Sequence, residues 1–127
     1  MEAPTSEKLR LGLRERWQRW LQPEWGQIFR ILFGDVLWEV PELFETWAEE
    51  GPLRGWALFQ RLIEEGQVSG EFREDADACV AARLVTSGLL FQAAPQVHLN
   101  PRSLDPCEPE RIFDSSIDML LRGLRAT

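Results

Sequence analysis

Residues 66–77, GQVSGEFREDAD, divide the chain into two apolar halves of different composition. All six tryptophans precede this stretch, whereas residues 78–94 after it are mostly small and aliphatic. Gly66 can adopt the left-handed conformation that ends a helix, and Asp75 can accept hydrogen bonds from the free amides that begin the next one. We therefore expect a corner between two differently built groups of helices.

Apolar residues recur at helical spacing on both sides of this corner. Thr5 and Ser6 can cap a first helix, and Pro41 interrupts the pattern because it disfavours helix at the residue before it. We expect helices to begin near residues 5, 23, 41, 52, 76 and 109, and the fourth to stop at Gly66. The sequence therefore predicts an all-α fold of about six helices in a single domain, residues 1–127. We expect the second helix to be mostly buried, and the third to turn these residues inward: Leu43, Phe44, Trp47 and Ala48.

Each of the last two predicted helices carries a second apolar face beyond the one needed for the core. A helix that is apolar on all sides, at the edge of so small a domain, must bury its second face against something else. We predict that the two helices form a four-helix contact with a second copy of the chain, a homodimer. The predicted contact residues are Leu84, Ser87, Gly88, Phe91, Ile112, Ser116, Met119 and Gly123.

The charge distribution argues against nucleic-acid binding by this chain alone. The net charge is −7, and residues 23–77 carry thirteen acidic but only four basic side chains. An acidic middle repels phosphate backbones. The basic residues near the N-terminus are more simply a solvated helix face than a DNA-contacting patch; they are Lys8, Arg10, Arg14, Arg16 and Arg19.

No catalytic or metal-binding pattern is present in the sequence. The one histidine, His98, falls in a predicted loop, and no Ser or Cys has a base at a recognisable spacing. Cys79 and Cys107 belong to no CxxC motif, so we expect neither a metal site nor a disulfide, and no cofactor. We therefore predict that the protein is not an enzyme, and keep a helical enzyme or metal protein only as a remote third hypothesis.

Localisation follows from two further features of the sequence. No segment is long and apolar enough to cross a membrane, and the N-terminal residues MEAPTSEKLR lack the apolar core of a signal peptide. We therefore predict a cytoplasmic protein that does not bind membranes.

The aromatic residues of the first half have two possible roles. Aromatic stripes on helices most often form the core. Large rigid side chains can also leave a gap between helices that binds a small hydrophobic or aromatic molecule. The two roles are compatible, and we predict that the residues nearest such a ligand are Trp17, Phe29, Phe33, Trp56 and Phe59.

Several short motifs, taken in order, resemble the C-terminal regulatory domain of TetR-family transcriptional regulators over nearly the whole chain. The resemblance implies an all-helical domain whose earlier helices enclose an inducer pocket and whose last two helices form the homodimer bundle. The motifs are Val40-Pro41-Glu42-Leu43-Phe44, Gly66 to Arg73 as G-x-x-x-G-E-F-R, Asp75 with Asp77, Ala81-Ala82-Arg83-Leu84 leading to Ser87-Gly88-Leu89, and Leu120-Leu121-x-Gly123-Leu124.

The function implied by this resemblance is that of a ligand-sensing and dimerisation domain, usually of a repressor that a small hydrophobic ligand releases from DNA. Such regulators begin with a helix-turn-helix head that this sequence does not supply, so no DNA-contacting residue transfers to it. The sequence leaves two interpretations open. The chain is a fragment or mis-started reading of a longer repressor, or it is a headless interaction protein that heterodimerises with full-length regulators.

Overall fold

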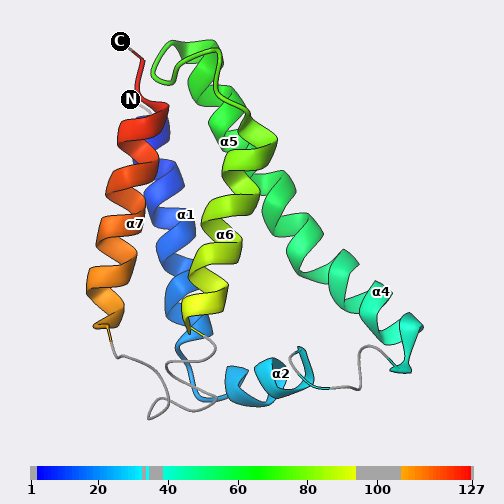
Figure 1. Ribbon diagram of the computed structural model, residues 1–127. Coiled ribbons are helices and arrows are strands. Elements are labelled where there is room, and N and C mark those ends of the chain that lie inside the picture. Colours follow the sequence, from blue (N-terminus) through cyan, green and yellow to red (C-terminus); the bar gives the residue numbers. More distant parts are fainter. Residues whose placement is uncertain (1–2, 33, 35–38, 94–106, 127) are drawn as a thin grey trace.

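The computed structural model describes residues 3–32, 34, 39–93 and 107–126 (Figure 1). Within these ranges the fold is all-α, as the sequence predicts, and its one β-type pairing is an isolated bridge between Phe72 and Arg125. The helices are α1 (Thr5–Trp20), α2 (Trp25–Leu32), α4 (Pro41–Glu50), α5 (Pro52–Ser69), α6 (Ala78–Ala93) and α7 (Pro109–Leu124).

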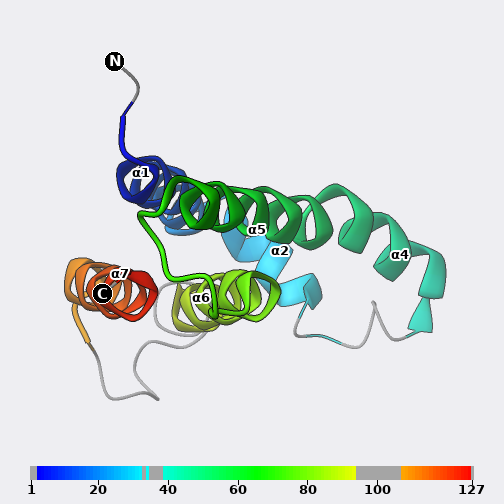
Figure 2. The same ribbon diagram turned by 90° about the horizontal axis from the view of Figure 1, so that it is seen from above.

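Five of the helices form two layers. Seen from above, α1, α5 and α4 make one layer and α6 and α7 make the other (Figure 2). Helix α6 contacts α5, α7 and α1, and α7 also contacts α1. Helix α2 crosses the lower end of the bundle, and α4 continues the line of α5 beyond it (Figure 1). One end of the molecule is therefore built by the 66–77 connection and the other by α2 and α4.

The core consists of one apolar stripe from each long helix. Leu9, Leu13 and Trp17 of α1 recur every four residues and are almost completely buried. They share the core with residues from the facing helices, namely Phe59 and Ile63 of α5, Ala82 and Leu89 of α6, and Phe113 and Ile117 of α7. The sequence analysis predicts that each of the last two helices has one apolar face in the core, and these buried positions of α6 and α7 form that face.

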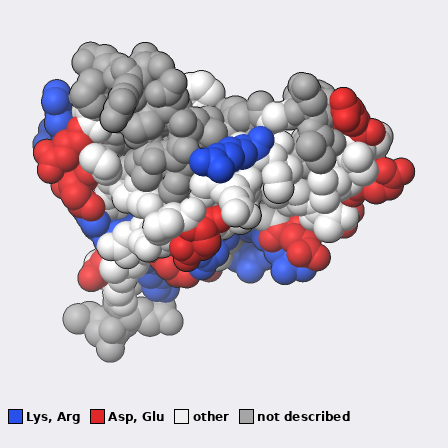
Figure 3. All heavy atoms as spheres, turned by 90° about the horizontal axis from the view of Figure 1, so that it is seen from below, with Lys and Arg blue, Asp and Glu red and all other residues white. Residues whose placement is uncertain are grey.

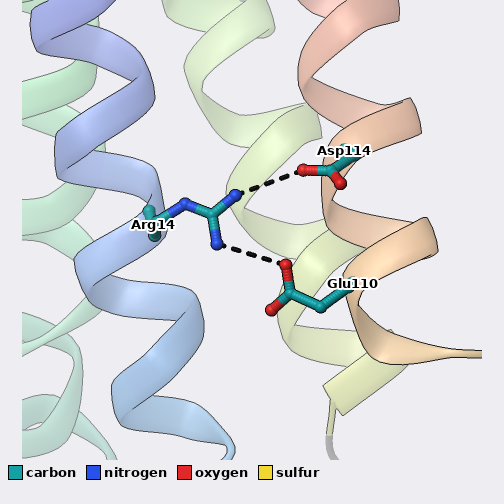
Figure 4. A network of polar contacts seen from close by, with 3 residues as sticks. All are labelled: Arg14, Glu110 and Asp114. Carbon is teal, nitrogen blue, oxygen red and sulfur yellow. Dashed lines mark hydrogen bonds and ion pairs between the residues drawn. The ribbon is translucent and has the colours of Figure 1, made fainter.

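Arg14 connects α1 to α7 (Figure 4). Its two terminal nitrogens donate to Glu110 Oε2 and Asp114 Oδ1, each at 3.2 Å. Its Cζ also lies 4.4 Å from the centre of the Phe113 ring. A planar guanidinium can use its edge for carboxylates and its face for an aromatic ring at the same time. Arg14 is therefore an interhelical contact, whereas the sequence predicted a merely solvated residue.

The connection of residues 66–77, here called the corner, differs in detail from the sequence prediction. Helix α5 continues through Gly66 to Ser69, and Gly70 is the residue with the left-handed backbone, at φ 85°. Gly66 is buried, and a Cβ built on it would collide with the ring of Phe72. The prediction that Gly66 ends the helix was therefore wrong, because this glycine makes room for a side chain that folds back onto α5.

The predicted helix caps were also wrong. The backbone amides of Thr5 and Ser6 donate to Glu71 Oε2 and Oε1 at 2.8 and 2.9 Å, so a carboxylate of the corner caps α1. At the start of α6, Asp77 Oδ1 accepts from the amide of Val80 at 3.1 Å, and Asp75 instead faces Arg73 at 3.8 Å. The Glu71 carboxylate caps α1 in place of the Thr5 and Ser6 hydroxyls because its two charged oxygens can each accept a hydrogen bond from a free amide at the helix N-terminus.

The corner also binds the end of α7. The amide of Arg73 donates to the Leu124 carbonyl at 2.7 Å, and the amide of Ala126 donates to the Glu71 carbonyl at 3.2 Å. Gln67 Nε2 donates to the carbonyls of Arg73 and Ala76 at 3.1 and 2.9 Å. The corner thus joins the ends of α1, α5, α6 and α7 by directed hydrogen bonds.

The other end of the molecule is less buried than the sequence predicts. Helix α4 has no buried residue, and Leu43 and Phe44 are 40% and 45% exposed, so their predicted inward orientation was wrong. In α2, Phe29 is buried but Ile31 is 44% exposed. These helices lie at the edge of the bundle, where they have fewer neighbours than α1 or α6 (Figure 1).

Candidate ligand cavity

A cavity of about 310 Å³ lies at the end of the molecule opposite the corner. Four of its wall residues are tryptophans: Trp20 of α1, Trp25 of α2, Trp47 of α4 and Trp56 of α5. Helix α6 completes the wall with Thr86, Ser87, Leu90 and Phe91. Five helices therefore contribute to one mostly apolar, concave site, which is the usual form of a small-molecule site between helices.

The space exists because the junction of α4 and α5 presents almost no side chains. Gly51, Pro52 and Gly55 line the cavity there. The rings of the surrounding tryptophans are rigid and cannot collapse into the gap as aliphatic chains would. The cavity thus follows from a glycine-rich junction that is enclosed by indoles.

Arg16 is the one charged residue among those that line the cavity. Its guanidinium lies against Gly55, where a Cβ would be 3.2 Å from Cζ, and its Cζ is 5.5 Å from the centre of the Phe59 ring. Burial lowers the pKa of this guanidinium, the charge of Arg19 lowers it further, and Glu15 partly offsets both. The side chain nevertheless stays protonated, as arginine does in proteins.

Two further polar groups are placed by α6. The Thr86 hydroxyl donates to the Ala82 carbonyl at 2.8 Å, so its proton is already used within the helix. Arg83, one turn earlier, lies over the ring of Trp56 with its Cζ 4.5 Å from the ring centre. The wall at Trp56 is therefore held by a cation–π contact.

The predicted ligand residues lie in different environments. Trp56 is on the cavity wall. Trp17, Phe29 and Phe59 are core residues with at most 1% exposure, and the Trp17 indole N–H is buried and has no hydrogen-bond partner among the described residues. Phe33 lies outside the described residues.

The sequence analysis did not include the other three wall tryptophans, Trp20, Trp25 and Trp47, among the predicted ligand residues. A signal for them was present. Trp47 and Trp56 flank the Gly51-Pro52 break, where a chain that changes direction leaves a space, and Trp20 ends the apolar stripe of α1.

The predicted dimer residues also divide between two places. Leu84, Gly88, Ser116, Met119 and Gly123 line a shallow groove along α6 and α7, and Leu84 and Met119 are 70% and 68% exposed. Ile112 packs in part against the core. Ser87 and Phe91 line the ligand cavity, so the two features meet along α6.

The charged side chains and potential metal ligands of the described residues were the remaining places where a site could lie. On the face shown in Figure 3, acidic and basic side chains are interspersed, with no continuous basic patch. No group of three or more potential metal ligands occurs among the described residues. None of the helices described is both long and apolar enough to cross a bilayer.

These observations define an all-helical domain with an aromatic cavity at one end and two helices whose outer faces are apolar and exposed. Residues 7–125 match the model of the AefR-like transcriptional repressor C-terminal domain, a TetR-family C-terminal domain. The chain belongs to this family, so the predicted resemblance is confirmed. No curated protein and no solved structure matches it. Membership supports, in general terms, a ligand-binding and dimerisation domain of a regulator with a non-enzymatic fold.

Proposed function

We propose that this chain is the ligand-sensing and dimerisation domain of a transcriptional repressor and that its ligand binds in the tryptophan-lined cavity. The observation that carries the proposal is the convergence of four tryptophans from four helices on one space of about 310 Å³. That volume is at the lower end of the ~300–1,000 Å³ typical of small-molecule sites. It suits a hydrophobic or aromatic compound of one or two rings.

Ligand binding would act on DNA binding through α1. Arg16 and Trp20, near the end of α1, line the cavity, and the first turn of the same helix is held by Glu71. A ligand that binds better to one position of α1 shifts the equilibrium toward that position. In a complete regulator, such a shift would change the spacing of the two DNA-reading helices and lower the affinity for the operator.

Tryptophan fluorescence tests the ligand site directly, because four of the five tryptophans that the structure describes line the cavity. We expect one or more members of a panel of neutral, anionic and cationic aromatic compounds to shift the emission and raise the Tm. Trp56→Phe should weaken the emission response, and Trp17→Phe, in the core, is the matched control that should keep it. Unchanged emission and Tm across the whole panel would contradict the proposal.

The same proposal assigns the exposed faces of α6 and α7 to a homodimer. Leu84 and Met119 are more than two-thirds exposed there, and a Cβ at Gly88 or Gly123 would meet no atom within 4 Å. Small residues beside aliphatic ones let a second pair of helices approach closely. A second copy of this surface would bury both apolar stripes.

Light scattering at micromolar concentration tests the dimer. The wild-type chain should be dimeric, and Gly88→Arg should be a folded monomer, because the arginine fits the isolated chain but places an unpaired charge in the contact. Met119→Glu should act in the same way. Val68→Glu is the control and should remain dimeric, since Val68 is 90% exposed on α5 and does not line the groove of α6 and α7. A monomeric wild-type chain would refute this assignment.

A further inference from the structure

The charge of the ligand can be inferred from the surroundings of Arg16. This residue is the one charged side chain on the cavity wall, and no aspartate or glutamate of the described chain lines the cavity. The walls are otherwise formed by indoles, a phenyl ring, glycines, aliphatic groups and the hydroxyl residues Thr86 and Ser87, so among the described residues the guanidinium is the one formal charge that lines the cavity.

Arg16 has no carboxylate partner among the described residues. Arg14 binds Glu110 and Asp114, Arg19 binds Glu15 at 2.7 Å, and Arg122 binds Asp118. Glu15, whose negative charge raises the pKa of Arg16, is thus already hydrogen-bonded to Arg19. Three arginines of α1 and α7, namely Arg14, Arg19 and Arg122, have their counter-ions within the fold, whereas Arg16, which lines the cavity, has none among the described residues.

Arg16 is only partly exposed to solvent in the absence of a ligand. Its guanidinium lies between the backbone at Gly55 and the ring of Phe59, where water can reach only part of it. A guanidinium carries five N–H donors in a planar fork that matches a carboxylate. An anion in the cavity would supply acceptors that neither the protein nor bulk water fully provides there.

We propose that the ligand is a flat, apolar organic anion whose single carboxylate pairs with Arg16 while its ring system packs among Trp20, Trp25, Trp47 and Trp56. This inference rests on the proposed ligand-sensing function and specifies it further. One guanidinium on the wall matches one negative charge, and the volume of about 310 Å³ limits the apolar part to about two fused rings.

The main competing ligand class is an aromatic or quaternary cation, since tryptophan cages bind such groups. In this cavity a cation would meet Arg16 with no carboxylate on the wall to offset the repulsion. A second guanidinium, that of Arg83, lies 4.5 Å from the centre of the Trp56 ring and adds to the positive potential. Both charges favour the anion.

Calorimetric titration with three probes of one shape tests the inference. The probes are naphthalene-2-carboxylate, its neutral carboxamide and 2-naphthylmethylammonium. For the wild-type chain we expect the carboxylate to bind at least tenfold more tightly than the amide, and the ammonium compound to bind most weakly. This comparison needs no variant, so it stands even if a substitution at Arg16 impairs folding.

Variants then assign the preference to Arg16. In Arg16→Gln, the carboxylate should lose at least tenfold in affinity while the amide changes by less than threefold. Arg16→Lys keeps the charge without the planar fork and should retain part of the preference. Arg10→Gln is the control, because Arg10 is exposed on the same helix, and it should bind like the wild type.

The outcomes separate this inference from the proposed function. If the amide or the ammonium compound binds the wild-type chain as tightly as the carboxylate, the cavity remains a ligand site and the anion inference is wrong. A carboxylate preference that persists unchanged in Arg16→Gln also overturns it. If none of the three probes binds, the inference of a two-ring anion is wrong, while the ligand-sensing function is decided separately by the broader panel of the fluorescence test.

Discussion

The two ends of the helical bundle satisfy their polar groups in opposite ways. At the corner, Glu71 caps α1, Gln67 bridges two carbonyls, and the backbone of Arg73 pairs with the end of α7. At the cavity end, Arg16 has no acidic partner among the described residues, and α4 has no buried side chain. The polar groups of the corner therefore find their partners within the fold, whereas the cavity end contains an open space and, in Arg16, a guanidinium without an acidic partner among the described residues.

This difference indicates how a small domain can be stable at one end and still change conformation at the other end when a ligand binds. Hydrogen bonds between distant segments fix the corner, so the relative positions of four helix ends are determined there. The cavity end is lined mainly by large rings, and α4 has no buried side chain there, so fewer buried contacts oppose local movement. Matched substitutions at the two ends test whether stability and binding are divided in this way.

The largest difference is expected from removing one aromatic ring at each end. Phe72, at the corner, is 2% exposed, so Phe72→Ala should lower the free energy of unfolding by about 3–5 kcal/mol. Trp56 is partly exposed on the cavity wall, so Trp56→Ala should lower the free energy of unfolding by only about 1 kcal/mol, mainly because the contact with Arg83 is lost. Urea denaturation measures both. Equal costs would show that the cavity end is as tightly packed as the corner.

A smaller contrast is expected from adding a methyl group to a glycine at each end. Gly66→Ala places Cβ against the Phe72 ring and should destabilise the protein by about 1–3 kcal/mol. The Cβ of Gly55→Ala would lie 3.2 Å from the movable tip of the Arg16 side chain and would contact no other group closely. The gain in helix propensity, up to about 1 kcal/mol, should offset this contact and leave the free energy of unfolding almost unchanged.

A double-mutant cycle sharpens this prediction. With the smaller side chain of Phe72→Leu in place, Gly66→Ala should become less costly, because the two positions are in direct contact. If the cost of Gly66→Ala is the same in both backgrounds, its cause is not the ring of Phe72.

The smallest effect expected is electrostatic and depends on pH. Burial alone would raise the pKa of Glu71, but the hydrogen bonds from Ser6 and Thr5 outweigh it, so the pKa lies below its usual value. Stabilisation by Glu71 is therefore fully present above the pKa of about 4.3 of the unfolded chain and is lost as pH falls through the lower folded value. Glu71→Gln should cost about 1 kcal/mol at pH 7, as the loss of a helix cap does.

Thermal denaturation between pH 7 and pH 3 measures this effect. The difference between the wild-type chain and Glu71→Gln should shrink as the pH falls. Glu74→Gln is the matched control, since Glu74 is exposed in the same corner and should have almost no effect at any pH. A difference that stays constant down to pH 3 would mean that the Glu71 carboxylate does not carry the cap.

The sequence predicted the features that depend on local patterns. Helix positions, the buried stripes of α1, α6 and α7, and the family all follow from spacing and short motifs. It did not predict that Glu71 caps α1, because the two segments are 65 and 66 residues apart in the chain. Nor could a periodicity argument tell that Phe59 is core while Trp56, three residues earlier on the same helix, faces the cavity. That distinction depends on how α5 crosses α1 and α6.

Helix α4 shows what an incomplete helix contributes. It has ten residues and no buried side chain, and a helix of that length is marginal in water without tertiary contacts. One of its side chains, Trp47, lines the cavity, so a bound molecule would become part of the surface against which α4 is stabilised. The amides of α4 should then exchange their hydrogens more slowly when the cavity is filled, while those of the corner stay unchanged. In that case the ligand would supply the apolar contacts that α4 does not receive from the rest of the protein.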